Sequence, residues 1–457
     1  MLRKSLDVLQ DDEHTAYDAY GLLGAAGDHQ IVAARAGRLI GRDEFLRDVA
    51  ALAARLPPRQ YVLNLCADRY RFMVALGAAL HRRQISLLPP NTAPTVLQAL
   101  AEDYPDHYTI ADAGHPPLPT FMFPEDLDGE RFAATDQAIP ATQAAILLFT
   151  SGSTGRPKPV AKSWGPLVRS ARSAGRRLGV PTPSGATVIG TVPHQHSYGF
   201  ESIILLGLQR GLIVDAGAPL YPYDVRARIE ASSGARILVT SPVHLRVLVN
   251  EPGGMPRVDL ILSATAPLPA PLAAQAEACF GGRLLEIYGC TEAGQVATRR
   301  TTQEVHWRCL DDVVLHQDQA GTWASGAAVE GRALLQDRID QVEPGTFLLG
   351  GRSADLVDVA GKRASLAHLN HQLTTIDGVQ DGVFLPQEAT GEHVARLMAL
   401  VVAPGLQPET ILRALRERID AAFLPRPLVL VDALPRNALG KLPREALLDL
   451  IGRGRGA

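Results

Sequence analysis

Residues 147–158 read LLFTSGSTGRPK and connect an apolar run, 144–149, to a loop rich in glycine, serine and threonine. The apolar run has the length of a buried strand. In the loop, glycines let backbone N–H groups converge, hydroxyls donate to phosphate oxygens, and Lys158 adds a positive charge. The sequence therefore predicts an anion-binding loop made of Thr150, Ser151, Gly152, Ser153, Thr154, Gly155 and Lys158. A solvated surface loop of the same composition is the alternative.

This loop differs from the P-loop of many nucleoside triphosphatases. The P-loop pattern GxxxxGK[ST] places its lysine directly after a glycine and before a serine or threonine. Here Lys158 follows Pro157 and precedes Pro159. A P-loop kinase or NTPase is therefore disfavoured.

Apolar runs alternate with segments of helical periodicity from this loop to about residue 290. The predicted strands are 186–192, 236–240, 258–263 and 283–288, and the predicted helices are 164–178, 202–210, 244–249 and 270–280. Strands that alternate with helices indicate βαβ units, in which a mostly parallel sheet is covered by helices. We therefore predict an α/β fold with a large N-terminal domain, residues 1–350, whose beginning carries no identifiable chemistry.

A second, smaller domain is predicted for residues 351–457. Its pieces are strands at 395–403 and 427–434, an amphipathic helix with Leu412, Leu415, Ile419 and Phe423 on one face, and a last helix at 444–451. About 100 residues suffice for a small α+β domain. The segment 350–355 is the predicted hinge between the two domains.

Length and charge narrow the class of protein. A chain of 457 residues is too long for one ordinary core and suggests two domains or more. Lys and Arg total 45 and Asp and Glu total 48, which gives a net charge of −3. That balance argues against binding nucleic acid or an anionic membrane through bulk charge. Aromatic residues make up only 5%, which also disfavours a base-stacking surface.

The remaining composition predicts a cytoplasmic protein without a structural metal. The four cysteines form no CxxC pair, and His194 and His196 have no second cluster of metal ligands nearby in sequence. The first twenty residues lack the features of a signal peptide. No apolar run approaches the ~20 residues that span a bilayer.

Further motifs follow the loop in a fixed order. They are Pro193-His194-Gln195-His196-Ser197-Tyr198-Gly199, Ser263-Ala264-Thr265-Ala266-Pro267-Leu268, Tyr288-Gly289-Cys290-Thr291-Glu292, Gly351-Arg352-Ser353-Ala354-Asp355 and Pro435-Arg436-Asn437-Ala438-Leu439-Gly440-Lys441. Asp337 lies eight residues before Gly345 and fifteen before Arg352. With residues 147–158, this series resembles the motifs of the adenylate-forming superfamily, over about residues 144–447. That superfamily includes acyl- and aryl-CoA synthetases, carrier-protein ligases, luciferases and peptide-synthetase adenylation domains.

The resemblance implies a role for each motif. The loop residues, together with Ser263, Ala264, Thr265, Tyr288, Gly289, Asp337 and Arg352, would bind ATP and AMP. Lys441, Thr291 and Glu292 would be catalytic, and Glu292 with Thr154 would hold Mg²⁺. Asp355 would be the hinge about which a mobile C-terminal domain rotates between adenylation and attack by a thiol.

These roles make physical sense for a carboxylate that attacks the α-phosphorus of ATP. The acid is already ionised at neutral pH, so no general base is needed and catalysis rests on positioning and charge stabilisation. The ammonium of Lys441 can reach both anions. A carboxylate such as Asp337 can accept bonds from both ribose hydroxyls. The family's TGD tripeptide is missing here, since Gln336 precedes the aspartate. The alternative is that Asp337 is one of three acids, with Asp340 and Glu343, on a solvated loop.

By the same resemblance, His196, Tyr198, Gly199, Phe200 and Cys290 would bind the acid, with Ser263 and Gly289 beside them. No partner for a substrate ammonium is evident, and two aromatics with hydroxyl neighbours suit a small aromatic acid. Ordinary core positions are the alternative for Tyr198 and Phe200. Nearby Glu201 is expected at a helix start, where a carboxylate suits the dipole.

The stretch GRPKPVAKSWGPLV, 155–168, resembles the acid:carrier-protein ligases of aryl-polyene and xanthomonadin pigment clusters. That resemblance implies a hydroxybenzoate-like acid and an acyl carrier protein as thiol acceptor. The predicted small domain carries no evident basic cluster for the phosphates of CoA. A CoA ligase for an aryl, medium-chain or hydroxy fatty acid is the alternative. A non-catalytic adenylate binder is disfavoured because Thr154, Glu292, Asp337 and Lys441 are all present.

Overall fold

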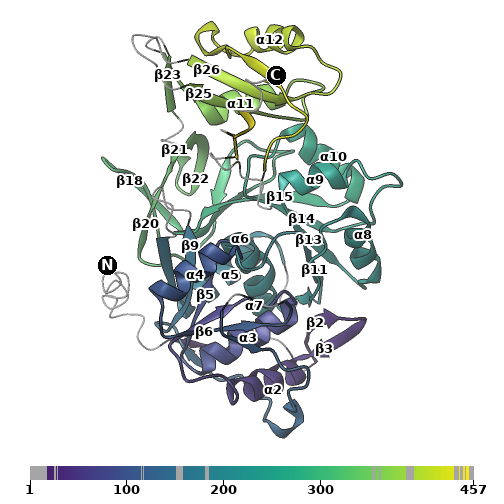
Figure 1. The fold of residues 1–457 in the computed structure, drawn as a ribbon, viewed down its shortest axis with the longest axis vertical. Helices are drawn as coiled ribbons and strands as arrows, with labels where there is room; N and C mark the ends of the chain where they lie inside the picture. The colour runs from purple at the N-terminus through teal and green to yellow at the C-terminus, as the bar shows by residue number, and fades with distance from the viewer. Residues whose placement is uncertain are drawn as a thin grey trace.

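The structure is a computed structural model. It describes residues 18–24, 27, 29–114, 116, 118–150, 158–180, 185–352, 356–359, 362–387, 396–436, 442, 446–447 and 449–451. Figure 1 shows the N-terminal half at one end of an elongated molecule and the elements after residue 356 at the other. Across these described ranges, every helix is too short or too polar to cross a membrane.

One sheet contains the strand that precedes the predicted anion loop. Its strand order is β10 (Lys158–Ser163), β9 (Ala144–Thr150), β5 (Ile85–Leu88), β4 (Tyr61–Asn64), β6 (His107–Ala111) and β7 (Thr120–Met122). All neighbours are parallel except β9 and β10, which pair antiparallel with Thr150 opposite Lys158. The two ends of the predicted loop are therefore fixed side by side.

A larger sheet carries the later motifs. Its strand order is β21 (Asp337–Glu343), β22 (Thr346–Arg352), β17 (Trp307–Cys309), β16 (Gly294–Arg299), β15 (Arg283–Cys290), β14 (Leu260–Ser263), β13 (Arg236–Thr240), β11 (Thr187–Gly190), β12 (Ile213–Asp215), β2 (Ile31–Arg35) and β3 (Arg38–Gly41). From β15 to β2 the neighbours are parallel, which confirms the expected α/β fold. The flanking pairs are antiparallel. Between β15 and β16, for example, the link is too short for a crossover.

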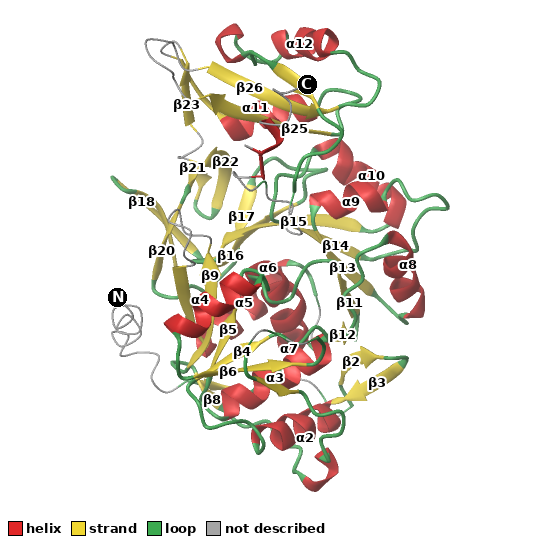
Figure 2. Cartoon of the chain, in the orientation of Figure 1, coloured by secondary structure: helices red, strands yellow, loops and turns green. Residues whose placement is uncertain are grey.

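Helices lie between the two sheets and on their outer faces (Figure 2). The central layer contains α2 (Arg42–Ala53), α3 (Arg69–His81), α5 (Trp164–Arg177) and a helical run formed by α6 (Ser197–Gly199), the π-helix η3 (Phe200–Leu205) and α7 (Leu206–Arg210). The outer helices are α4 (Pro94–Asp103) on the first sheet and α8 (Pro222–Ala231), α9 (Pro242–Leu248) and α10 (Ala270–Phe280) on the second. Small peripheral elements are β1 (Ala19–Tyr20), η2 (Gly129–Arg131), β8 (Ile139–Pro140), β18 (Val314–Asp318), β19 (Gly321–Ser325) and β20 (Arg332–Leu335).

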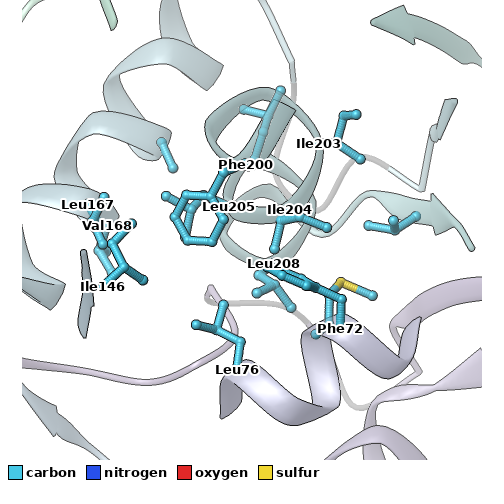
Figure 3. Close-up of a cluster of buried hydrophobic side chains, with 14 of the residues drawn as sticks. Phe72, Leu76, Ile146, Leu167, Val168, Phe200, Ile203, Ile204, Leu205 and Leu208 are labelled. Atoms are coloured by element: carbon cyan, nitrogen blue, oxygen red, sulfur yellow. The ribbon is translucent and has the colours of Figure 1, made fainter. Parts of the chain in front are cut away.

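The main core joins both sheets through this central layer. Figure 3 shows side chains of α3, α5, β9 and the 197–210 helical run meeting in one cluster. Phe200 is fully buried there, and its ring lies 6.4 Å from that of Phe72 in an edge-on arrangement. Core packing thus fixes the helical run that follows the histidine motif.

The C-terminal region has α+β structure and apolar clusters of its own. It contains β23 (Leu356–Val359), β24 (Lys362–Ser365), α11 (Leu366–Thr374), β25 (Asp381–Gln387), β26 (Arg396–Val402), α12 (Pro408–Arg416), η5 (Ala421–Phe423) and β27 (Leu428–Leu430). The predicted helix through Phe423 was wrong in extent. It ends at Arg416, and Asp420 caps a separate 3₁₀ turn by accepting from the backbone N–H of Ala422.

Candidate active site

The carboxyl ends of neighbouring parallel strands form the candidate site. Thr240 at the end of β13 is in register with Ser263 at the end of β14, and β15 lies beside β14. The histidine, small-residue and Tyr288–Glu292 motifs all follow at or just beyond these strand ends. In open α/β sheets, ligands bind in the crevice at this edge. The fold therefore brings together motifs that the sequence only places in order.

Tyr288 and Asp337 are in direct contact. The Tyr288 hydroxyl donates to Asp337 Oδ2 at 2.9 Å. The Tyr288 ring is buried, and its centroid lies 5.7 Å from that of Trp307 and 5.8 Å from that of Phe347. The aromatic packing fixes the tyrosine, and the tyrosine in turn orients a carboxylate that remains half-buried at the site.

The predicted spacing of Asp337, Gly345 and Arg352 corresponds to a hairpin. Asp337 is paired with Arg352 across β21 and β22. Gly345 lies in the connecting turn with φ +74°, a value that favours glycine. Asp340 and Glu343 are exposed. Of the three acids considered from the sequence, Asp337 is the one whose carboxylate contacts another site motif.

The small-residue stretch after β14 presents buried hydroxyls to the site. Within the described part of the chain, Ser263 Oγ and Thr265 Oγ1 are buried and have no hydrogen-bond partner. Thr265 also has φ +81°, which is strained for a β-branched residue. Buried polar atoms are normally paired, so two unpaired hydroxyls this close together are unusual and need an explanation.

The two histidines of the motif differ in burial. His194 is buried and its Nε2 lies 2.9 Å from the Cys66 carbonyl oxygen, which also accepts from Gln195 Nε2 at 3.1 Å. Burial, together with nearby Arg69, lowers the pKa of His194 to about 3. His194 therefore anchors the segment as a neutral ring, whereas His196 is half-buried at the start of α6.

Two motif glycines are required by close backbone contacts. A Cβ at position 199 would lie 2.1 Å from the Pro193 carbonyl oxygen, and one at position 289 would lie 2.2 Å from the Gly294 carbonyl oxygen. Any side chain there would push the strand-end loops apart. These glycines thus keep the histidine segment and the β15–β16 connection compact.

The remaining predicted acid-binding residues differ in environment. Tyr198 is half-buried, and desolvation of its hydroxyl raises its pKa well above the usual value. Burial raises the pKa of the Cys290 thiol to about 11, so the thiol is protonated at neutral pH. Phe200 lies wholly within the core, which agrees with the core alternative for that residue.

Thr291 and Glu292 form the connection between β15 and β16. Thr291 is half-buried and Glu292 is exposed. In the described residues, no group of three or more His, Cys, Asp and Glu side chains is placed to hold a metal ion. Mg²⁺ needs no such cage, because it is often held by one or two carboxylates plus substrate phosphates and water. An exposed carboxylate at this sheet edge fits that mode.

Several predicted residues cannot be located. Ser151, Gly152, Ser153, Thr154, Gly155, Asp355 and Lys441 lie outside the described residues. Thr150 and Arg352 are placed by their backbone pairing, and Lys158 is exposed at the start of β10. Ala264 is buried beside Ser263.

Sequence reasoning missed buried charged residues around the site. Arg69 is fully buried and donates to the carbonyl oxygens of Gly190 at 2.9 Å and Val192 at 3.3 Å, where it holds the end of β11. Lys162 is buried in β10, and its Nζ donates to the Glu292 carbonyl oxygen. A lysine inside an otherwise apolar strand segment, VAKSW, was the available signal. Arg69 had no local signal in the sequence.

Known proteins with similar sequences are ligases that act on carboxylic acids. The 4-coumarate–CoA ligase of Halorhodospira halophila is 29% identical over 65% of this chain and 75% of its own length. The 3,4-dihydroxybenzoate–[aryl-carrier protein] ligase of Bacillus anthracis is 21% identical over 76% of this chain and 83% of its own.

Solved structures share the whole fold. The ATP-bound RpMatB-BxBclM chimera B3 gives a TM-score of 0.78 at 18% identity, covering 99% of each chain. The o-succinylbenzoate CoA synthetase of Bacillus subtilis, bound to its acyl-adenylate, gives 0.75 at 19% identity and covers 92% of this chain and 95% of that one.

The model of the AMP-binding enzyme family matches residues 54–316, more than half of the chain. That stretch contains the predicted anion loop and the strand-end motifs described above. The protein therefore belongs to the AMP-binding enzyme family and is a ligase of the kind that activates a carboxylic acid with ATP.

Proposed function

We propose that this protein activates a small aromatic acid, such as a hydroxybenzoate, and transfers it to the phosphopantetheine thiol of an acyl carrier protein. In the first step a carboxylate oxygen attacks the α-phosphorus of ATP, the bond to the β-phosphate breaks, and pyrophosphate leaves. In the second step a thiolate attacks the acyl carbon and AMP leaves. The thiol proton passes to solvent.

The contact between Tyr288 and Asp337 carries the nucleotide part of the proposal. It joins the motif at the end of β15 to the β21–β22 hairpin and leaves a half-buried carboxylate at the site. We assign Asp337 to the ribose hydroxyls and the free hydroxyls of Ser263 and Thr265 to the adenosine region. Arg352, paired with Asp337 across the hairpin, is assigned to the same ligand.

We assign the phosphate end to the anion loop, Thr291 and Glu292. Glu292, with Thr154, would hold Mg²⁺, which supplies positive charge to the phosphates. Lys441 would neutralise the repulsion between the incoming carboxylate and the α-phosphate. Because Lys441 belongs to the predicted mobile domain 351–457, with its hinge at Asp355, adenylation would need that domain closed over the site.

The proposed class of acid rests on the side chains that we assign to acid binding. Tyr198, Gly199, Cys290 and His196 are the residues assigned to the acid, and the thiol and tyrosine hydroxyl there are uncharged at neutral pH. A pocket lined by uncharged and partly aromatic side chains suits an aromatic ring with a hydroxyl substituent. The similarity to a dihydroxybenzoate carrier-protein ligase supports the same class of acid and acceptor.

A CoA ligase for an aryl or fatty acid is the second candidate. Similarity to 4-coumarate–CoA ligase, at 29% identity, favours it. Both candidates share the first step and differ in the thiol that attacks in the second.

The test is acid-dependent exchange of pyrophosphate into ATP across hydroxybenzoates, cinnamates, fatty acids and amino acids. Strong exchange with one hydroxybenzoate is the expected result. Holo carrier protein and CoA are then compared as acceptors of that acid. Exchange with fatty acids alone would overturn the aromatic substrate, and transfer to CoA alone would overturn the carrier-protein acceptor.

A further inference from the structure

Two buried side chains of opposite charge hold the two ends of the connection between β15 and β16. Lys162 on β10 donates from Nζ to the backbone carbonyl oxygen of Glu292. Glu201 on η3 accepts from the backbone N–H of Gln295 at 3.0 Å. Residues 292 to 295 are therefore attached on one side to the first sheet and on the other to the central helical layer. The site residues Thr291 and Glu292 lie in this connection.

Both side chains are deeply buried. Lys162 and Glu201 are each 4% exposed. Burial lowers the pKa of Lys162, and the nearby carboxylates of Glu201 and Glu330 oppose that effect. Burial also raises the pKa of Glu201, against the Ser197 hydroxyl and Lys162. Charges this deep are costly unless compensated, so Lys162 depends on its hydrogen bond and the nearby carboxylates, and Glu201 depends on its hydrogen bonds and on nearby Lys162.

Glu201 is itself held in place from its own helix. The Ser197 hydroxyl donates to Glu201 Oε1 at 2.7 Å, and the Gln295 side chain donates to the Ser202 hydroxyl at 3.0 Å. Glu201 lies near the start of its helical run, as expected, but its carboxylate faces the β15–β16 connection and not solvent. The π-helical turn that carries it is a feature often found at functional sites.

We propose that Lys162 is a positioning residue for adenylation: its ammonium, balanced by Glu201, fixes the backbone of Glu292 so that the Glu292 carboxylate and the Thr291 hydroxyl face the phosphates. This inference rests on the proposed function for the role of Thr291 and Glu292. Lys162 acts through the backbone of the connection and touches no reacting atom.

Replacing Lys162 with Met keeps the length and apolar character of the side chain and removes the donor. The expected result is a fall of about 10- to 100-fold in the maximal rate of pyrophosphate exchange, since small misplacements of catalytic groups have effects of that size. The maximal rate should fall more than the KM for the acid rises, because Cys290 alone among the residues assigned to the acid adjoins this connection. Ser163→Ala is the matched control. Ser163 is the next residue of β10, is equally buried, and bonds to Glu330 instead of the β15–β16 connection.

A double variant distinguishes two roles of Lys162, which are to position the backbone of Glu292 and to balance the charge of Glu201. Lys162→Met alone removes the cation near the buried Glu201 carboxylate and leaves only its hydrogen bonds, so it should also lower the melting temperature. In Lys162→Met with Glu201→Gln the charge is gone from both positions, and the melting temperature should recover while the exchange rate stays low. Recovery of both the stability and the rate would overturn the proposal, because charge balance alone would then explain the pair.

Hydrogen exchange provides a readout that does not depend on activity. In Lys162→Met, and not in Ser163→Ala, the amides of residues 291–296 should exchange about tenfold faster. Unchanged amide exchange at residues 291–296 would overturn the proposed positioning role of Lys162, even if the wild-type protein is active. The other possible outcome is that the amides exchange faster in Lys162→Met but the wild-type protein activates no acid. That result would support the positioning role of Lys162 and overturn the proposed function.

Discussion

The sheet-edge site and the C-terminal region are built in different ways. At the sheet edge, residues far apart in the sequence are joined by partly buried hydrogen bonds, such as Tyr288 to Asp337 and Lys162 to Glu292. The C-terminal region has apolar clusters of its own, and Asp381 links it to the rest through Arg246 on α9 at 3.6 Å. The same carboxylate accepts from Arg436 at 2.6 and 2.7 Å, just before the segment that leads to Lys441.

From this difference we expect the sheet edge to be rigid, and the contact between the C-terminal region and the rest of the protein to break and re-form easily. Hydrogen bonds to charged groups contribute about 1.5–3 kcal/mol each, whereas an ion pair at 3.6 Å, beyond hydrogen-bond distance, contributes less. A polar contact between two independently packed parts permits their relative movement at low cost. The arrangement fits a nucleotide site on the sheet edge and a lysine delivered by a mobile domain, and the following variants test that contrast in order of expected effect.

Lys441→Ala should have the largest effect. We expect pyrophosphate exchange to fall about 100-fold or more, because the charge placed between two anions is lost. ATP binding, measured by calorimetry, should remain within a few-fold of the wild type. Lys362→Ala, a lysine of the same region, is the control. Formation of acyl-AMP at the normal rate in Lys441→Ala would refute the proposed mechanism.

Asp337→Asn should weaken the use of ATP. Loss of a charged hydrogen-bond acceptor for the ribose should lower kcat/KM for ATP about 10- to 100-fold. Asp340→Asn is a matched control on the same strand, where the aspartate is exposed and pairs with Arg338. Equal effects of the two substitutions in steady-state kinetics would mean that Asp337 has no special role.

Gly289→Ala should destabilise the sheet edge itself. The added methyl would lie 2.2 Å from a backbone oxygen, so the two strands must separate. A loss of about 1–3 kcal/mol in the free energy of unfolding is expected from such overpacking, measured by denaturant titration. Gly27→Ala, where a Cβ would meet nothing within 4 Å, should leave stability unchanged. If Gly289→Ala leaves the free energy of unfolding unchanged, the two strands can separate at less cost than their packing indicates.

Arg246→Ala should have the smallest effect. Its contact with Asp381 is an ion pair at 3.6 Å, beyond hydrogen-bond distance, so we expect it to contribute about 0.2–1 kcal/mol. We expect the ratio of adenylation to thiol transfer, measured in separate half-reaction assays, to shift by less than about fivefold. Arg257→Ala, which removes an exposed pair with Asp259, should leave that ratio unchanged. A tenfold shift would mean that the contact holds the C-terminal region firmly.

The spacing of apolar residues in the sequence correctly predicted several helices and strands. The strand at 236–240 and the helix at 270–280 were confirmed residue for residue, and the βαβ alternation predicted the parallel centre of the large sheet. The antiparallel flanks and the end of α12 at Arg416 were not predicted, because they depend on short connections and a local cap.

The sequence alone determined which chemical groups this protein has and in what order. The glycine- and hydroxyl-rich stretch at 150–158, the Tyr288–Glu292 motif and the spacing from Asp337 to Gly345 and Arg352 can be read without a structure. Only the tertiary structure decided which groups meet. Tyr288 and Asp337 are 49 residues apart, and Lys162 and Glu292 are 130 apart. Such contacts leave no periodic signal, because they form when packed sheets bring distant strand ends to one edge and bury the charges that hold them there.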